Sequence, residues 1–278
     1  MKKMKPLAVI GEHYNILVDK GYEVVYVALY GSQNYHMDTP NSDVDSKAIV
    51  LPKLDDIILN KQPISKTINM PCGGLCDVKD IRQMFKNFKK QNINFLEILF
   101  TEYCICNRKY IRLVEELLLN REAIAHYNNY ALISAIVGMV TNKYKMMEHL
   151  SPATEDAIKK YGYDPKQLHH MERLYDFLFR YTTTDDSFKK LLTPNNIDDI
   201  MMYKTNPIPL EEARKEAKDI YYNVGFMKET YMAEHKLTIN HDIDTLLDNL
   251  ASETIKMELR EELLNDNTNT NNDGRNIE

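Results

Sequence analysis

Residues 31–52 of this 278-residue chain read GSQNYHMDTPNSDVDSKAIVLP, a polar loop that runs into an apolar segment. The segment just before it, residues 22–30 (YEVVYVALY), is rich in β-branched and aromatic side chains and predicts a strand. A second strand is predicted over residues 43–51, because Pro52 closes another apolar run. The stretch therefore predicts a strand, turn, strand unit with Gly-Ser at the end of its first strand.

Two aspartates open the second predicted strand. Asp43 and Asp45 are two residues apart, so their carboxylates are expected on one face of the strand, with Lys47 following on that face. Neighbouring like charges on a sheet are destabilising unless a cation lies between them, and such hard oxygens suit Mg²⁺ together with substrate phosphates. At Gly31 and Ser32, backbone N–H groups and a hydroxyl can approach a phosphate closely. The stretch thus predicts a metal and nucleotide site.

The rest of the chain divides by its patterning. Residues 53–71 read as a loop, and GLCDVKD (residues 74–80) reads as a third strand running into a helix that Asp80 caps. Beyond residue 108 the strand signal largely stops, and apolar residues at helical spacing predict helices over 112–120, 121–150, 165–182, 210–235 and 242–264. We expect an α/β (α+β) catalytic domain over 1–108, a helical domain over 109–265 and a disordered polar tail over 266–278.

Composition excludes several classes of protein. The net charge is −6, which argues against coating nucleic acid through bulk charge. No apolar run approaches the ~18 residues of a membrane span, and the apolar stretch near the N-terminus is too short for a secretory signal. We therefore expect a cytoplasmic protein with no membrane partner. The spacing of the four cysteines favours reduced thiols over a zinc site: Cys72, Cys76, Cys104 and Cys106.

The order of the motifs resembles the nucleotidyltransferase superfamily that includes DNA polymerase β, and most closely its branch of predicted bacterial and phage nucleotidyltransferases. Gly-Ser at the end of a strand, Ser-Asp-x-Asp on the next strand and a later single Asp carry the resemblance. Further stretches that look like that branch are DIR from Asp80, NFLEIL from Asn94 and GYDPK from Gly162. The likeness spans roughly residues 22–180 and implies a small mixed-sheet catalytic domain followed by a helical one.

The resemblance implies that three catalytic carboxylates, Asp43, Asp45 and Asp77, hold two divalent ions, Mg²⁺ or Mn²⁺. The implied reaction moves a nucleoside monophosphate from a nucleoside triphosphate such as ATP to an acceptor hydroxyl and releases pyrophosphate. Asp80 is the alternative third ligand, although its role as a helix cap already explains it. Lys47 either neutralises triphosphate charge or pairs with the aspartates when no metal is bound.

A second set of candidates lies in KQLHHMER, residues 166–173. On a helix, Lys166, His170 and Arg173 share one cationic face that suits a triphosphate or a nucleic-acid phosphate. The alternative is a solvated face with Glu172 and Asp176 as ion-pair partners. The full nucleotide-binding set predicted from the sequence is Gly31, Ser32, Lys47, Lys166, His170 and Arg173.

The acceptor is the part that the sequence determines least. The acidic total argues against long nucleic acid, whereas the basic residues Lys86, Lys89 and Lys90 favour a structured RNA end such as that of tRNA. We prefer an RNA 3′ end slightly. The alternatives are an adenylyltransferase acting on a protein or small molecule, and a non-catalytic nucleotide-sensing or antitoxin-like binding module. Tyr35 either stacks on a base or covers the core edge, and Glu97 is expected to form a hydrogen bond between helix and loop.

Overall fold

The computed structural model describes residues 5–40 and 42–273. Within that part of the chain, five strands form one mixed sheet in the order β3-β4-β2-β1-β5. The β2–β4 pair is parallel and the other pairs are antiparallel. This arrangement confirms the predicted α+β class. The strands are β1 (Glu23–Tyr30), β2 (Asp45–Leu51), β3 (Ser65–Asn69), β4 (Leu75–Asp80) and β5 (Cys104–Cys106).

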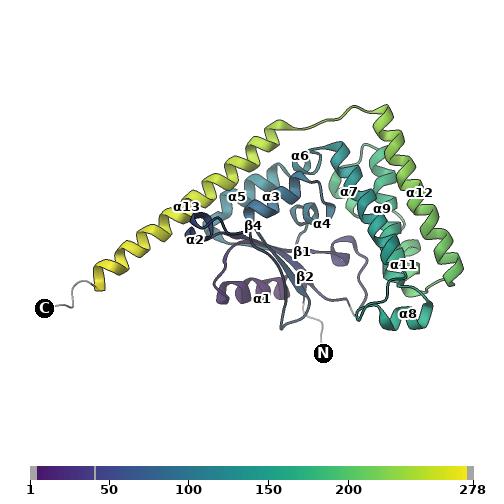
Figure 1. The fold of residues 1–278 in the computed structure, drawn as a ribbon, viewed down its shortest axis with the longest axis horizontal. Helices are drawn as coiled ribbons and strands as arrows, with labels where there is room; N and C mark the ends of the chain where they lie inside the picture. Colours follow the sequence, from purple (N-terminus) through teal and green to yellow (C-terminus); the bar gives the residue numbers. More distant parts are fainter. Residues whose placement is uncertain (1–4, 41, 274–278) are drawn as a thin grey trace.

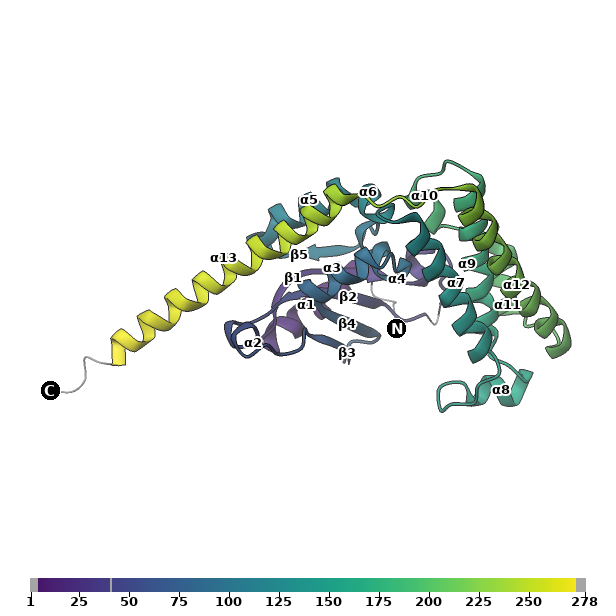
Figure 2. The same ribbon diagram turned by 45° about the horizontal axis from the view of Figure 1, so that its top comes forward.

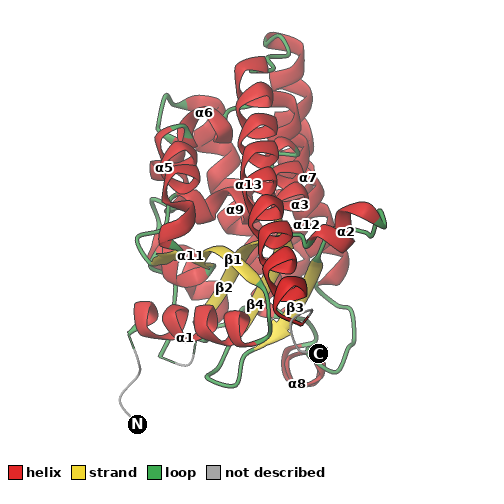
Figure 3. Ribbon diagram, turned by 90° about the vertical axis from the view of Figure 1, so that its left-hand side faces the viewer, coloured by secondary structure: helices red, strands yellow, loops and turns green. Residues whose placement is uncertain are grey.

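The sheet lies between two helical layers (Figures 1 and 3). One face is covered by α1 (Pro6–Asp19), whose Ile10 and Leu17 pack with Val27 and Ala48 of the sheet. The other face packs against α3 and the helices that follow it. The short elements of the first hundred or so residues are η1 (Ser32–Tyr35), α2 (Leu54–Ile58), α3 (Ile81–Lys89), α4 (Ile93–Leu96), η2 (Glu97–Leu99) and η3 (Arg108–Tyr110).

The second half of the described chain is helical, as the periodicity predicted. Its elements are α5 (Ile111–Leu119), α6 (Arg121–Ala125), α7 (Asn129–Met146), α8 (Glu155–Tyr161), α9 (Pro165–Thr183), α10 (Phe188–Leu192), α11 (Ile197–Thr205), α12 (Leu210–Glu234) and α13 (His241–Asp273). The single helix expected over 121–150 is wrong, because Asn128 breaks it. Its side-chain oxygen accepts a hydrogen bond from the Ala131 N–H at 2.8 Å and starts α7 as a new helix.

One hydrophobic core joins the sheet to the helices. Ile49 of β2, Phe88 of α3, Phe177 of α9 and Leu247 of α13 belong to the same buried cluster. The buried core is therefore continuous across residue 108. The division into a catalytic domain over 1–108 and a helical domain over 109–265 stays a prediction.

The last helix, α13, runs back from the helical half across α3 and α5 and extends beyond the body (Figures 1 and 2). It continues to Asp273, whereas the sequence predicted a polar tail without regular structure from residue 266, and residues 274–278 lie outside the described part. Once the packed part of a helix has formed, adding residues at its end carries no nucleation penalty. No helix in the described ranges is long and apolar enough to cross a membrane.

Candidate active site

The turn after β1 begins at Gly31, which has φ 90° and ψ −154°, a backbone conformation that suits glycine. The Gly31 N–H donates to Glu97 Oε2 at 3.1 Å. This amide is therefore satisfied by Glu97 inside the protein, and its approach to a phosphate stays a prediction. The next residue, Ser32, starts η1 and lines a cavity between the turn and the helical half.

The predicted acidic residues lie beside that turn on two neighbouring strands. Lys47 of β2 is in register with Asp77 of β4, and Asp45 lies two residues before Lys47. Because side chains alternate along a strand, Asp45, Lys47 and Asp77 share one face of the sheet. The Asp45 Oδ1 accepts the Leu75 N–H at 2.8 Å, which orients this carboxylate toward β4.

Asp43 does not share that arrangement. The expected strand from residue 43 is wrong in its first two residues, since β2 begins at Asp45 and Asp43 lies exposed in the loop before it. The Gln33 side chain donates to the Asp43 carbonyl oxygen at 3.0 Å and holds this loop against η1. The sequence pattern alone could not show this, because a two-residue spacing implies a common face only where the backbone is extended.

Asp77 is paired with two lysines. Its carboxylate lies 2.7 Å from Lys79 Nζ and 3.4 Å from Lys47 Nζ. The Lys47 ammonium also lies over the Tyr30 ring, 3.7 Å from its centroid, and over Phe95 at 4.5 Å. Burial lowers the pKa of Lys47, and Asp77 opposes that shift. Of the two predicted roles for Lys47, this structure shows the pairing with an aspartate.

The three predicted ligands are all hard oxygen donors, which fits Mg²⁺ or Mn²⁺ in chemistry. Across residues 5–40 and 42–273, no group of three or more His, Cys, Asp or Glu side chains is close enough to hold an ion. Two lysines on Asp77 and the exposed position of Asp43 explain this. An ion bound at these residues has to replace the lysine charge at Asp77.

Asp80 caps α3, as the sequence predicted. Its Oδ1 accepts the Arg82 N–H at 2.8 Å, and the Arg82 Nε donates to both carboxylate oxygens at 3.0 and 3.2 Å. The carboxylate is fully buried in these interactions. Because residues 77 and 80 are an odd number apart on β4, Asp80 faces away from Asp45 and Lys47.

A cavity of about 180 Å³ lies between the Gly31 turn and helices α7 and α9, and we call it the nucleotide cavity. It brings together four of the residues predicted to bind nucleotide, namely Gly31, Ser32, His170 and Arg173. The other residues that line it are Tyr30, Tyr35, Met37, Asn94, Glu97, Met139, Lys143, His169 and Leu174.

Arg173 forms the wall of this cavity that is contributed by α9. It is only 5% exposed, which overturns the alternative of a solvated face for this residue. Its guanidinium lies 4.3 Å from the centroid of the Tyr35 ring, while Nε and Nη1 are buried without a hydrogen-bond partner. Tyr35 in turn donates its hydroxyl to Glu97 Oε2. Tyr35 is buried at the core edge with one face covered by an arginine.

The other two members of the predicted cationic face behave differently. Burial first, and then Arg173, lowers the pKa of His170 well below its usual value, so the ring is neutral at pH 7. Lys166 is exposed and does not line the nucleotide cavity. His169, expected to face elsewhere, hydrogen-bonds the Ile200 carbonyl at 3.1 Å and also lines the cavity. The face predicted as three cations therefore contributes one buried cation.

Comparison with known protein families shows the family of this chain. Residues 4–168, more than half of the chain, match the family described as RlaP, the RNA repair pathway DNA polymerase beta family. The chain belongs to this family. It is a nucleotidyltransferase of the polymerase β type, as the motif order predicted. A crystal structure of a nucleotidyltransferase-like protein from Exiguobacterium sibiricum 255-15 is similar over 80% of this chain and 75% of that chain, at 10% identity and a TM-score of 0.29. Curated proteins gave no match.

In this RlaP-family nucleotidyltransferase, the cavity contains a second cation that sequence reasoning missed. Lys143 of α7 lines it, and burial together with Lys166 lowers the pKa of Lys143. Lys143 precedes Arg173 by thirty residues, and only the packing of α7 on α9 brings the two together. No spacing rule within one helix could have found this pair.

Glu97 is the buried acid of the same site. It is 1% exposed, and burial raises its pKa, while Tyr35, Arg173 and the Gly31 N–H oppose that shift. It connects the loop after β1 to η2, which matches the hydrogen-bonding role expected from the sequence. Glu97 also accepts the hydroxyl of Tyr35, whose ring Arg173 covers.

Proposed function

We propose that this nucleotidyltransferase transfers a nucleoside monophosphate from a nucleoside triphosphate to the 3′ hydroxyl of an RNA. The observation that carries the proposal is the Arg173 guanidinium, which is buried at the nucleotide cavity with Nε and Nη1 unpartnered. Burying such donors without partners is destabilising, and phosphate oxygens match the geometry of the guanidinium fork. The RNA preference is supported by the family's description as an RNA repair pathway family.

The residues around the cavity have different roles in this proposal. Arg173 and Lys143 hold the triphosphate oxygens, and a bound phosphate raises the pKa of Lys143 toward its usual value. The Ser32 hydroxyl donates to the same group from the opposite wall. Asp43, Asp45 and Asp77 would hold divalent ions, Mg²⁺ or Mn²⁺, which polarise the phosphoryl oxygens when bound.

The transfer is a single displacement at phosphorus. The acceptor oxygen forms a bond to the α-phosphorus, the bond from that phosphorus to the bridging oxygen breaks, and its electron pair leaves with pyrophosphate. The proton of the acceptor hydroxyl is released to water. Protein groups that hold both reactants in line convert this bimolecular step into one within a complex.

Calorimetry with a nonhydrolysable ATP analogue and Mg²⁺ tests the nucleotide half of the proposal. Arg173→Ala should weaken binding by about 1.5–3 kcal/mol, as expected for a lost charge-assisted hydrogen bond. Arg180 is the matched control: it is buried on the same helix, but it donates to Asp176 and to three carbonyl oxygens. Arg180→Ala should lower stability and leave nucleotide affinity unchanged. Unaltered affinity in Arg173→Ala contradicts the proposal.

A labelling experiment tests the acceptor half. The purified protein is incubated with α-labelled nucleoside triphosphates and Mg²⁺ in a total cell lysate, and the RNA, protein and small-molecule fractions are separated. Label in the RNA fraction, lost with Asp45→Asn, is the expected result. Label confined to the protein or small-molecule fraction rejects RNA as the acceptor but leaves nucleotidyl transfer in place.

A further inference from the structure

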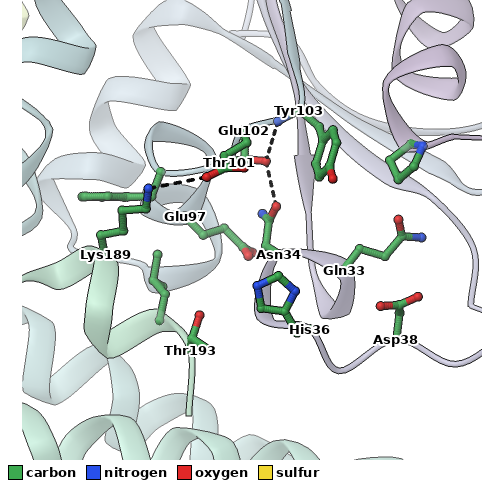
Figure 4. A pocket seen from close by; sticks show the side chains of 13 residues that line it. Gln33, Asn34, His36, Asp38, Glu97, Thr101, Glu102, Tyr103, Lys189 and Thr193 are labelled. Carbon is green, nitrogen blue, oxygen red and sulfur yellow. Dashed lines mark hydrogen bonds and ion pairs between the residues drawn. The ribbon is translucent and has the colours of Figure 1, made fainter. Parts of the chain in front are cut away.

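A second cavity, of about 280 Å³, is lined by other residues of the same turn (Figure 4). Gln33 and Asn34 of η1 face it, whereas Gly31 and Ser32 face the nucleotide cavity. Glu97 lines both. The two cavities are therefore neighbours that share one wall, and a ligand in the second lies next to a ligand in the first.

The second cavity is also tied to the acidic loop. The Gln33 side chain that lines it donates to the carbonyl oxygen of Asp43 at 3.0 Å. A ligand that contacts Gln33 is thus one side chain away from the segment that carries the first predicted catalytic carboxylate. This position suits the second reactant of a transfer reaction.

The walls combine apolar area with fixed polar groups. Phe100 and Leu192 supply buried apolar surface, and Tyr103 is 38% exposed at the rim. The Asn34 amide is held in place, because its Nδ2 donates to the Leu29 carbonyl at 3.0 Å and its Oδ1 accepts from Thr101 Oγ1 at 2.7 Å. Fixed amides and an accessible aromatic ring are what proteins use to bind single-stranded bases.

The charges argue for a base rather than a polyphosphate in this cavity. Lys189 lies at the left of the view and Asp38 at the right, with His36 between them (Figure 4). The Lys189 Nζ is 3.7 Å from Glu102, so the cation that lines the cavity already has a carboxylate beside it. A volume near the lower end for ligand pockets fits one nucleoside.

We propose that the second cavity binds the terminal nucleoside of the RNA acceptor, with its base against Tyr103 and its edge toward the Asn34 and Gln33 amides. This proposal rests on the proposed function, since it assigns a place to the acceptor of that reaction.

Fluorescence anisotropy with the full chain tests the assignment. The probes are 5′-fluorescein hexaribonucleotides of A, C and U with free 3′ ends, and calorimetry with the nonhydrolysable ATP analogue is run in parallel. Tyr103→Ala should weaken binding of the oligonucleotide at least about fivefold, the effect expected for loss of one stacked base. Tyr103→Phe should restore it. Tyr222, a 61% exposed tyrosine on α12, provides the control Tyr222→Ala, which should bind as the wild type does.

The outcomes separate the two proposals. Nucleotide affinity should stay within about twofold of wild type in Tyr103→Ala, because Tyr103 does not line the nucleotide cavity. Oligonucleotide binding that Tyr103→Ala leaves unchanged overturns the assignment of the second cavity. The assignment is also overturned if the wild-type protein binds the ATP analogue but none of the oligonucleotides. In that case the acceptor of the nucleotide is a protein or a small molecule. Failure to bind either ligand rejects both proposals.

Discussion

Asp77 and Asp80 show how one residue's position on a strand separates two carboxylates that the sequence left as alternatives. Both lie on β4, but side chains alternate between the faces, so only Asp77 shares a face with Lys47 and Asp45. Asp80 is fully buried in its hydrogen bonds to Arg82. The geometry favours Asp77 over Asp80 as the third carboxylate that holds the divalent ions in the proposed reaction.

Asp77→Asn should therefore abolish transfer while the protein remains folded and binds the ATP analogue. Asp80→Asn should keep turnover within a few-fold of wild type, because the amide oxygen still accepts the Arg82 N–H. Asp80→Ala should lower the free energy of unfolding by about 1–2 kcal/mol through the lost cap. Turnover and urea unfolding of the three variants measure this, and activity lost at position 80 but kept at 77 reverses the assignment.

Glu97 is expected to act as a positioning residue for the turn. Glu97→Ala leaves the buried Gly31 N–H and the Tyr35 hydroxyl without their acceptor, so turnover should fall at least tenfold and stability by about 2–4 kcal/mol. Glu97→Gln supplies an acceptor oxygen and should restore most of the stability and turnover. Steady-state kinetics and thermal unfolding check both. Equal damage from the two substitutions shows that the charge, and not the hydrogen bonds, is what matters.

Among the helices and strands, local sequence patterns predicted the elements that form through local interactions. The strands β1, β2 and β4 and the Asp80 cap of α3 followed from β-branched runs and one capping residue. The strand β3 was missed because it is an edge strand with mostly exposed side chains, and β5 because it has only three residues. These two strands are stabilised by their pairing partners, which no local pattern reveals.

The same limit applies to the site. Arg173 was found because a helix periodicity placed it on a face, but its burial comes from α7, η1 and the sheet. Likewise, Lys89 was read as part of an RNA-binding patch, whereas it lies 2.9 Å from Asp244 and 2.8 Å from Asp248 of α13. A charge run shows that cations are present, but only the fold shows which of them are already paired.

The packing of α9 against α11 and α12 predicts a dependence of stability on pH. Burial first, and then Glu216 of α12, raises the pKa of Glu172 to about 7 from its ordinary 4.5. Because this acid binds its proton more tightly in the folded state, its stabilising contribution is complete below pH 4.5 and is lost as pH rises through 7. Glu172→Gln should add about 1–2 kcal/mol of stability at pH 8 and almost none at pH 4.5. Urea unfolding at both pH values measures this, and an equal gain at the two excludes titration of Glu172 as the cause.

At the scale of the whole molecule, α13 holds the two halves together. It begins beside the helical half. Its acidic side chains Asp244 and Glu258 form ion pairs with Lys89 of α3 and Lys109 of η3 in the sheet half. Such exposed pairs contribute at most about 1 kcal/mol each. The larger contribution is Leu247, which is fully buried in the core that also contains Ile49 of β2 and Phe177 of α9.

Leu247→Ala should therefore destabilise the entire molecule and not the end of one helix. The expected loss is about 2–5 kcal/mol, the range for a buried leucine that leaves a cavity. Leu264 lies on the same helix, is 64% exposed and provides the matched control, for which Leu264→Ala should change stability by less than about 0.5 kcal/mol. Far-ultraviolet circular dichroism and tyrosine fluorescence should give coincident transitions in both variants, since one core unfolds as one unit. Two separated transitions in Leu247→Ala instead mean that residues 1–108 and 109–265 fold independently, as the division of the sequence into two domains predicts.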